Sequence, residues 1–396
     1  MIVELHMIQN FAPSCLNRDD TNSPKDCDFG GVRRARISSQ CLKRSIRMSD
    51  TFKESIKVEV GVRTRMLYQE LADHLKAGGK GESDINPILR AFIPSLVGAI
   101  DEDERTKVLL FLGKDEIIRI EQILDKNWDS LTGKNTPTSD NKTGAEPKKK
   151  GKKASESSPL EEICKTIVKE FKPGTISPDI ALFGRMVADK HAFNVEAACQ
   201  VAHAISTHRV NMDMDFFTAV DDLQPKDETG AGMMGTVEFD SACFYRYSAL
   251  DVNELMKNLG GDRALTLRTL DGFLHGSIEA IPSGKQNSMA AHNLPSLLLV
   301  AVRAKGQPWS LANAFATPVT ETGHGLVETS TLRLGRYTKD MFQMYGGSGI
   351  DMIGYAVIGS AQMADLESIG AKRFESVADL LGSIGRRTDE LLGNKA

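Results

Sequence analysis

The sequence predicts an α+β protein in which a helical subdomain is inserted into a mixed core. Strand-like runs lie at the start and in the second half of the chain, and helical patterning recurs between them. The strand-like runs are residues 2–8, 236–247 and 297–302, and the helical stretches are residues 61–75, 87–100 and 106–124. This mixed order favours an α+β core. The 396 residues, 41% hydrophobic and 26% charged, suit two or three folding units with buried cores.

The N-terminal elements follow from local composition. Residues 2–8 mix apolar and polar positions and predict an opening strand. Residues 9–32 are rich in Pro, Asn, Asp and Gly and predict a long loop. Because Ser38 and Ser39 are N-cap candidates, we expect a helix from there to about Met48.

Residues 133–159 contain no Leu, Ile, Val, Met or aromatic residue. Such a stretch cannot bury enough apolar surface to offset the entropy of ordering it, so we expect a disordered insertion or linker. Its seven lysines against three acids leave two interpretations open, contact with nucleic acid or a solvated loop.

Helices and strands are expected to mix in the second half of the chain. The helices predicted there are residues 160–171, 195–207, 253–259 and 361–369. The second of these would place Ala197, Val201 and Ala204 on one side.

Charge and segment patterns narrow the class of protein. The 49 Lys and Arg against 53 Asp and Glu give a net charge of -4, which offers no global electrostatic reason to bind nucleic acid. We find no secretory leader and no window apolar enough to span a membrane, so a cytoplasmic protein is expected. The six cysteines form no Cys-x-x-Cys pair, which is typical of reduced thiols in that compartment.

Positive charge is concentrated in residues 29–49, which hold six basic residues and no acid. At spacings of three and four, Gln40, Lys43 and Arg47 share one helix face, while Leu42 lies on another that can dock on a sheet. We interpret the segment as a phosphate-binding patch, and an ordinary solvated basic helix is the alternative.

Two other motifs are weaker. Cys199, His203 and His208 resemble part of a zinc site, but they come from one predicted helix without a fourth ligand, so helix packing is the preferred interpretation. Residues 230–235, GAGMMG, match a dinucleotide-binding glycine pattern. Because a strand and not a helix follows them, we expect a loop that enters a strand.

The segment around Phe216-Phe217-Thr218 combines aromatic and acidic residues. Asp213, Asp215, Asp221 and Asp222 could hold Mg²⁺ or could simply be solvated. The adjacent aromatics, on a mobile excursion, could act as an apolar wedge between bases, or one of them could be buried. No signature of a serine hydrolase, zinc protease or nucleotide-binding phosphate loop is present in the sequence.

Several blocks of sequence carry a resemblance to one family. They are PSCLNRDDTNSPKDCDFGG at residues 13–31, RRARISSQCLKRSIR at 33–47, ALFGRMVAD at 181–189 and VAHAISTHRVNMDMDFFTAVDDL at 201–223. Together they closely resemble the backbone subunit of the type I-E CRISPR Cascade complex, the CasC family. The resemblance extends through GTVEF and FYRY in residues 235–247 and through Asn313-Ala314-Phe315, so it covers most of the chain.

The resemblance implies a fold and its domains. The expected fold is a ferredoxin-like, RRM-related palm with an inserted helical fingers subdomain and a protruding thumb hairpin. The implied boundaries are 1–58, 179–210 and 237–396 for the palm, 59–178 for the fingers with the insertion at 133–159, and 211–236 for the thumb loop. Because the palm carries no aromatic-rich RNP motif, its sheet face is not expected to stack RNA.

The resemblance also implies RNA-binding residues. Positions that match backbone-contacting residues of the family are Arg18, Lys25, Ser38, Gln40, Lys43, Arg44 and Arg47. Met186 matches a methionine that packs against bases near a kink, and Phe217 and Thr218 match the thumb tip, where a base is flipped out. No catalytic residue, metal or cofactor is expected.

The implied function is that of a non-catalytic scaffold in antiviral defence. Copies would oligomerise along the CRISPR RNA, grip its backbone and present it for pairing with a target DNA strand, together with other Cascade subunits and without a membrane. The alternative is a metal-dependent, RNA-cleaving backbone subunit as in type III complexes, with Asp19, Asp20 or the thumb acids in that role. A stand-alone single-strand-binding protein is a weaker third interpretation.

Overall fold

In the computed structural model the chain forms two compact units. The described residues are 1–133, 159–171, 174–187, 190–223, 233–320, 323, 325–359 and 363–393. The sheet unit comprises Met1–Lys57, Ala198–Leu255 and Arg263–Ala396, and the helical unit comprises Val58–Ala197 and Met256–Asp262. The predictions for the lysine-rich insertion and for the first glycines of GAGMMG lie outside the described residues.

The sheet unit is built on one large mixed sheet with the strand order β12-β11-β10-β1-β9-β7-β3-β2. At its centre β1 (Ile2–Ser14) pairs antiparallel with β9 (Met233–Asp251) on one side and with β10 (Leu297–Arg303) on the other. The remaining strands are β2 (Asp26–Phe29), β3 (Val32–Ile37), β6 (Cys199–Val201), β7 (Ala204–Ser206), β8 (Asp213–Ala219), β11 (Ile350–Val357) and β12 (Lys372–Arg373). The predicted α+β class and its three strands are confirmed.

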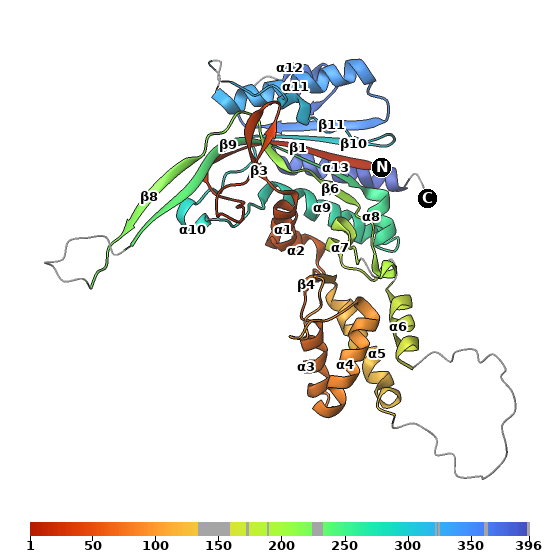
Figure 1. The fold of residues 1–396 in the computed structure, drawn as a ribbon. Coiled ribbons are helices and arrows are strands. Elements are labelled where there is room, and N and C mark those ends of the chain that lie inside the picture. Colours follow the sequence, from red (N-terminus) through yellow and green to blue (C-terminus); the bar gives the residue numbers. More distant parts are fainter. Residues whose placement is uncertain are drawn as a thin grey trace, which may run out of the picture. The chain divides into compact units, whose positions relative to one another are not determined.

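Helices cover both faces of this sheet (Figure 1). One face carries α1 (Ser39–Met48), α2 (Asp50–Ile56), α9 (Arg263–Glu279) and α13 (Val377–Gly393), and the other carries α11 (Gly325–Tyr345), α12 (Ala364–Glu367) and the 3₁₀ turn η2 (Ala312–Phe315). The helices α8 (Val252–Asn258) and α10 (Gln286–Met289) are short. Because both faces are covered, the apolar strand β10 is buried along its whole length.

A polar and aromatic cluster is buried on the central strands. Arg303 Nε donates to Glu4 Oε1 at 2.9 Å, and His6 Nδ1 lies 2.9 Å from the hydroxyl oxygen of Tyr245. The His6 ring stacks on Tyr247 with 5.0 Å between ring centroids. All five side chains are buried, so this part of the sheet is not an open stacking platform for bases.

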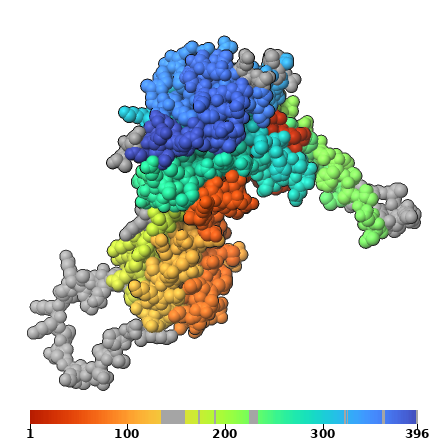
Figure 2. All heavy atoms as spheres, turned by 180° about the vertical axis from the view of Figure 1, so that it is seen from behind, coloured from red at the N-terminus to blue at the C-terminus, as the bar shows by residue number. Residues whose placement is uncertain are grey.

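A hairpin made of β8 and the outer part of β9 extends from the sheet, as Figures 1 and 2 show from opposite sides. The inner part of β9, Asp240–Asp251, pairs with β1, and its outer part, Met233–Phe239, pairs with β8. The hairpin is therefore a continuation of a central strand. The aromatics at 216 and 217, expected on an excursion flanked by loop residues, lie within β8.

The helical unit packs its helices around a separate apolar core that includes Leu71, Phe92 and Ile120. Its elements are β4 (Val62–Thr64), α3 (Leu67–Ala77), α4 (Glu82–Val97), β5 (Leu110–Leu112), α5 (Lys114–Leu131), α6 (Pro159–Glu170), α7 (Pro178–Phe183) and the 3₁₀ turn η1 (His191–Phe193). The grouped helices predicted from the sequence are confirmed. Their boundaries shift because β4 and β5 occupy the beginnings of the first and third predicted helices.

A buried ion pair ties this unit together. Arg185 Nη1 lies 2.6 Å from Glu116 Oε2, and both side chains are buried. Arg185 Nε donates to the Phe193 carbonyl at 2.7 Å, and Glu116 Oε2 accepts the N–H of Gly113 at 2.8 Å, which caps the start of α5. Gly184 precedes the arginine with a φ of +75°, and a Cβ there would lie 2.9 Å from the Val195 carbonyl oxygen, so only glycine fits.

Three expectations about secondary structure are corrected. Residues 195–207 were expected to be a helix, but they contain β6 and β7, because Cys199–Val201 and Ile205–Ser206 pair with β9. Residues 9–32 are not one loop, since β1 continues to Ser14 and β2 pairs with β3. The helix expected at 361–369 is reduced, within the described residues, to α12. Among the described helices, none has the length and apolar character that crossing a membrane requires.

We expect Arg185→Leu to destabilise the helical unit by about 3–5 kcal/mol, because it leaves the Glu116 carboxylate buried without its cation. The measurement is urea unfolding followed by the fluorescence of Trp128, which lies in the core of this unit. A Trp309→Phe background removes the only other tryptophan of the sequence.

The double variant Arg185→Leu with Glu116→Gln is the matched control. Glutamine removes the buried charge but keeps an acceptor for the Gly113 N–H, so about 2 kcal/mol should return. A double variant as unstable as the single one would show that packing of the arginine, and not the unpaired charge, causes the loss.

Candidate nucleic-acid interface

Helix α1 begins at a well-defined cap and is anchored by one face. Ser38 is the N-cap residue, and its Oγ accepts the N–H of Cys41 at 3.3 Å. Leu42 and Ile46 are buried, as their spacing predicted. The predicted start and end of this helix are confirmed, because both the cap and the apolar face are local signals.

The polar residues of α1 differ in exposure. Gln40 and Arg44 are exposed and Lys43 is half-buried, whereas Arg47 is only 6% exposed. The expectation that Gln40, Lys43 and Arg47 form one accessible face is therefore wrong for Arg47. In the last turn of α1, Ile46 and Arg47 are both buried, and the helix packs against α2 and α9. An RNA contact by Arg47 stays a prediction.

Arg34, counted in the predicted basic patch, is fully buried and holds strands together. Its guanidinium donates to the carbonyl oxygens of Phe29 at 3.1 Å, Ser206 at 3.0 Å and Phe315 at 2.8 Å. Burial lowers the pKa of this arginine. The neighbouring Arg33 pairs with Asp26. The patch predicted from residues 29–49 therefore offers fewer accessible cations than the six basic residues in that segment.

The loop after β1 adds cations to the start of α1. Asn17 joins the two, because its Oδ1 accepts the N–H of Ser38 at 2.8 Å and its carbonyl accepts the N–H of Lys25 at 2.9 Å. The Lys25 carbonyl in turn accepts the N–H of Arg36 at 2.8 Å. Arg18, in the same loop, is exposed and donates to Asn22 Oδ1 at 2.6 Å.

His203, which lies between β6 and β7, completes this surface. Its Nδ1 lies 3.2 Å from the backbone nitrogen of Ser39 and 3.4 Å from Arg36 Nη1. Burial, Arg36 and Lys25 all lower the pKa of the imidazole. Arg36 was counted in the predicted basic patch, but His203 was not predicted to bind RNA. Residues 195–207 were expected to be a helix, and only the pairing of β3 with β7 brings His203 beside Arg36.

These residues are brought together by the fold and are named here the basic surface. Its members are Arg18, Lys25, Arg36, Ser39, Gln40, Lys43, Arg44 and His203. Lys25 and Arg44 are both near enough to Cys41 to oppose the rise that burial causes in the pKa of its thiol. Such a cluster of cations, amide and imidazole groups provides donors for an anionic backbone.

The hairpin presents two different faces. Phe217 of β8 lies opposite Gly235 of β9, and a Cβ at position 235 would lie 2.6 Å from Phe217 Cζ. The ring of Phe217 therefore covers the glycine backbone and is half-buried. Phe216 points to the other face and is 62% exposed, on the side that also holds Thr218 and Met234. The two residues predicted for the thumb tip, Phe217 and Thr218, thus lie on opposite faces.

Met186 belongs to the helical unit and is 86% exposed. It follows directly after Arg185, whose buried ion pair with Glu116 holds the backbone at this point. An exposed methionine next to an anchored residue is presented to solvent in a defined place. Its predicted contact with bases stays a prediction.

The residues considered for metal binding form no metal site within the described part of the chain. Asp19 Oδ1 accepts the N–H and the hydroxyl of Thr21 at 2.9 and 2.8 Å and the N–H of Ser23 at 3.0 Å, and the hydroxyl contact is the main reason that the pKa of Asp19 is lowered. His208 Nε2 accepts the N–H of Cys243 at 3.2 Å, so this nitrogen is already used and does not form a zinc site with His203. Within the described residues no group of three His, Cys, Asp or Glu side chains could hold a metal.

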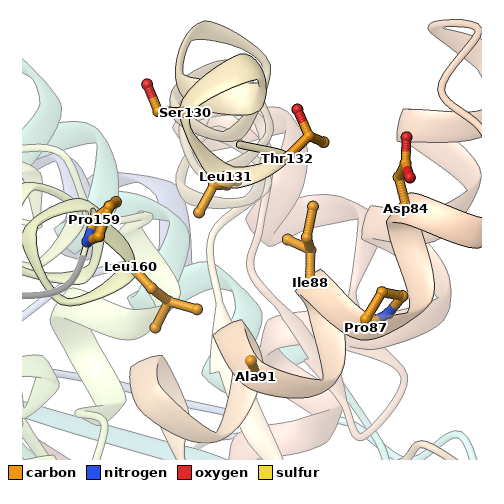
Figure 3. Close-up of a pocket in the computed structure, with 9 residues that line it drawn as sticks. All are labelled: Asp84, Pro87, Ile88, Ala91, Ser130, Leu131, Thr132, Pro159 and Leu160. Carbon is orange, nitrogen blue, oxygen red and sulfur yellow. The ribbon is translucent and has the colours of Figure 1, made fainter. Parts of the chain in front are cut away.

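The helical unit has a groove of about 410 Å³ (Figure 3). Ile88, Leu131 and Leu160, from α4, α5 and α6, point into it. Among the described residues that line it, Asp84 is the only charged one. None of the residues predicted to bind RNA belongs to this described lining, which offers no cation for a phosphate.

Asp240 lies at the base of the hairpin. It is 6% exposed and faces Ser14 in the register of β9 and β1, just beyond the register shift that follows Phe11. Burial raises the pKa of its carboxyl group to about 7. We therefore expect this carboxyl group, where β9 leaves the sheet for the hairpin, to change its protonation near pH 7.

Comparison with known proteins relates this arrangement to one family. Residues 3–381 match the family described as CT1975-like protein. A chain of a "CRISPR RNA-guided surveillance complex, pre-nicking" is 28% identical, with a TM-score of 0.80 and coverage of 98% of this chain and 100% of that chain. A chain of a "CRISPR RNA-guided surveillance complex" at 24% identity, with a TM-score of 0.70 and the same coverage, shares the fold. The comparison with curated proteins found no match.

We expect the Asp240 carboxyl group to lower the stability of the sheet unit as pH rises from about 4 to above 7, and Asp240→Asn to remove this contribution. A carboxyl group whose pKa is higher in the folded chain favours the protonated folded state, so its contribution is present at low pH and is lost as pH rises through about 7. At pH 8 the variant should be more stable by up to about 4 kcal/mol.

Thermal unfolding of both proteins between pH 5 and pH 8 makes this measurement. Asp222→Asn, at an exposed position on the same hairpin segment, is the matched control and should follow the wild type. An equal pH dependence in wild type and Asp240→Asn would contradict the assignment.

Proposed function

The chain belongs to the CT1975-like family, the backbone subunits of type I-E CRISPR surveillance complexes, and on this premise we propose that it is a non-catalytic, RNA-binding scaffold. It polymerises along the CRISPR RNA, grips the RNA backbone and presents the guide for pairing with a target DNA strand. Copies of the same chain and other Cascade subunits are its partners, and the cytoplasm is its place of action.

The basic surface is the observation that carries this proposal. It joins the start of α1, the loop after β1 and the connection between β6 and β7 through hydrogen bonds of 2.8–3.2 Å. Arg18, Lys25 and Arg44 offer cationic groups at its surface. Because the contacts go to an anionic backbone and not to bases, one copy can bind any guide sequence.

The strand order supports a ferredoxin-like palm. In the order β10-β1-β9-β7, each strand is antiparallel to its neighbours. Along the chain β1 is followed by α1 and α2, then by the helical unit and β7, and β9 is followed by α9 and β10. This is the strand–helix–strand order, repeated once, that an RRM-related fold requires. The proposed fingers are inserted before β7 and the proposed thumb before β9.

The hairpin is the proposed thumb. Its Phe217 and Thr218 would be inserted where the RNA is kinked, and Met186 of the fingers would pack against the neighbouring bases. Aromatic and thioether groups suit this use, because every base offers a face for stacking. The firm position of the Phe217 ring over Gly235 and the high exposure of Met186 support these roles.

We expect Lys43→Ala with Arg44→Ala to weaken RNA binding and to shorten RNA-bound assemblies. Each lost phosphate contact should lower the slope of log affinity against log salt concentration by about 0.7, so two should lower it by about 1.4. Binding of the full chain to single-stranded RNA over a range of salt concentrations measures the slope, and electron microscopy measures the length of the assemblies.

The control changes the same charge elsewhere on the sheet unit, with Lys305→Ala and Arg336→Ala, both exposed. This control should retain the wild-type slope. The same loss in both double variants would mean that binding depends on net charge and not on the basic surface. Periodic cuts in RNA with Mg²⁺ that disappear in Asp19→Ala would favour the cleaving alternative.

We expect Phe217→Ala to abolish the regularly spaced, flipped nucleotides of the bound guide while leaving assembly intact. The phenylalanine is the proposed wedge, whereas the grip on the backbone lies on the basic surface. Chemical probing of the guide at nucleotide resolution within the assembled complex makes the measurement.

Phe216→Ala is the matched control, because it removes the same side chain from the opposite face of the hairpin. Gly235→Ala should give a partial loss, since a Cβ at position 235 displaces the Phe217 ring. A pattern that persists in Phe217→Ala but disappears in Phe216→Ala would assign the wedge to the other face.

A further inference from the structure

We propose that His203 is an additional RNA-binding residue, whose Nε2–H donates a hydrogen bond to an oxygen of the RNA backbone. The inference rests on the proposed function, because it adds one contact to the basic surface.

The hydrogen bonds of His203 decide which ring nitrogen carries the proton. Nδ1 lies 3.2 Å from the Ser39 nitrogen and 3.4 Å from Arg36 Nη1, and both of these groups can only donate. Nδ1 must therefore be the acceptor, which places the proton on Nε2. Among the described residues none accepts a hydrogen bond from Nε2, and the side chain is exposed.

The position of His203 is fixed on both sides by strand pairing. Val201 of β6 pairs with Ser248 of β9, and Ala204 of β7 pairs with Ile37 of β3. The Ala202 N–H donates to the Tyr247 carbonyl at 3.0 Å. The ring is thus held at the start of α1 before any ligand arrives, so forming the contact costs little ordering of the side chain.

The charges around the ring explain why a neutral donor suits this place. Lys25 and Arg36 are the charged groups that act on it, and both disfavour a further positive charge. Together with partial burial they lower the pKa of His203. A neutral imidazole adds a donor between the cations without repelling them.

A phosphate oxygen is the acceptor that this setting favours, because the neighbouring cations attract the phosphate to the same place. The ribose 2′-hydroxyl is a second acceptor on the same backbone and can be distinguished by using DNA, which lacks it. Both acceptors belong to the backbone, so the contact would be independent of guide sequence.

The test compares two substitutions that each keep one nitrogen's role. In His203→Asn the side-chain oxygen replaces the Nδ1 acceptor, but the donor at Nε2 is lost. In His203→Gln an amide N–H₂ replaces the Nε2 donor, but the Nδ1 acceptor is lost. The affinity of the full chain for a single-stranded RNA is measured by fluorescence anisotropy, with thermal unfolding as a check that each variant folds.

We expect binding about tenfold weaker in His203→Asn and near wild type in His203→Gln. The opposite order would overturn the inference, because His203 would then act only by accepting the Ser39 N–H. Wild-type binding in both variants, or an equal loss in both, would overturn it as well.

A single-stranded DNA of the same sequence identifies the acceptor. A loss in His203→Asn on both RNA and DNA assigns the phosphate, and a loss on RNA alone assigns the 2′-hydroxyl. Failure of the wider proposal is recognised separately. If Lys43→Ala with Arg44→Ala binds RNA like the wild type, the basic surface itself is wrong, whereas weak binding there with no effect at His203 rejects only the additional contact.

Discussion

The continuous strand β9 is the constraint on which the sheet unit depends. Its inner half pairs with β1 on one side and with β6 and β7 on the other, and its outer half pairs with β8. Backbone groups within a sheet are satisfied by their neighbours, so the base of the hairpin cannot turn without breaking these hydrogen bonds. One strand therefore fixes the centre of the sheet, the position of His203 between β6 and β7, and the direction of the hairpin.

Burial separates the cations that stabilise the fold from those that can meet a ligand. Arg34 and Arg185 direct their guanidinium groups to carbonyl and carboxylate oxygens inside the protein. A buried guanidinium needs such partners because its donors have left water. Arg18 and Arg44 remain exposed. Affinity for an anionic chain then follows from a local concentration of charge, which is compatible with a net charge of -4.

The parts of the fold that sequence reasoning found are those with local signals. Helix α1 begins at Ser38 and buries Leu42 and Ile46, which a cap and a helical spacing already indicate. The helix prediction for residues 195–207 was wrong. Ala197, Val201 and Ala204 fit a helix by spacing alone, but the structure of this segment is set by its pairing with β9, which is distant in the sequence. The error concealed His203, since a residue on a supposed helix gave no reason to place it beside Arg36 and Ser39.

The sequence by itself determined the α+β class, one strand at the start and two in the second half of the chain, the grouped helices and the basic segment around α1. These features depend on propensity, capping and periodicity, which act over a few residues. The tertiary structure decided which of those basic residues are accessible. It buried Arg34 and Arg47, placed Phe216 and Phe217 on opposite faces and joined Asn17, Lys25, Arg36 and His203 to the start of α1. Accessibility and hydrogen-bond partners depend on strand register between segments about 170 residues apart, as Arg36 and His203 are, and no local pattern encodes that register.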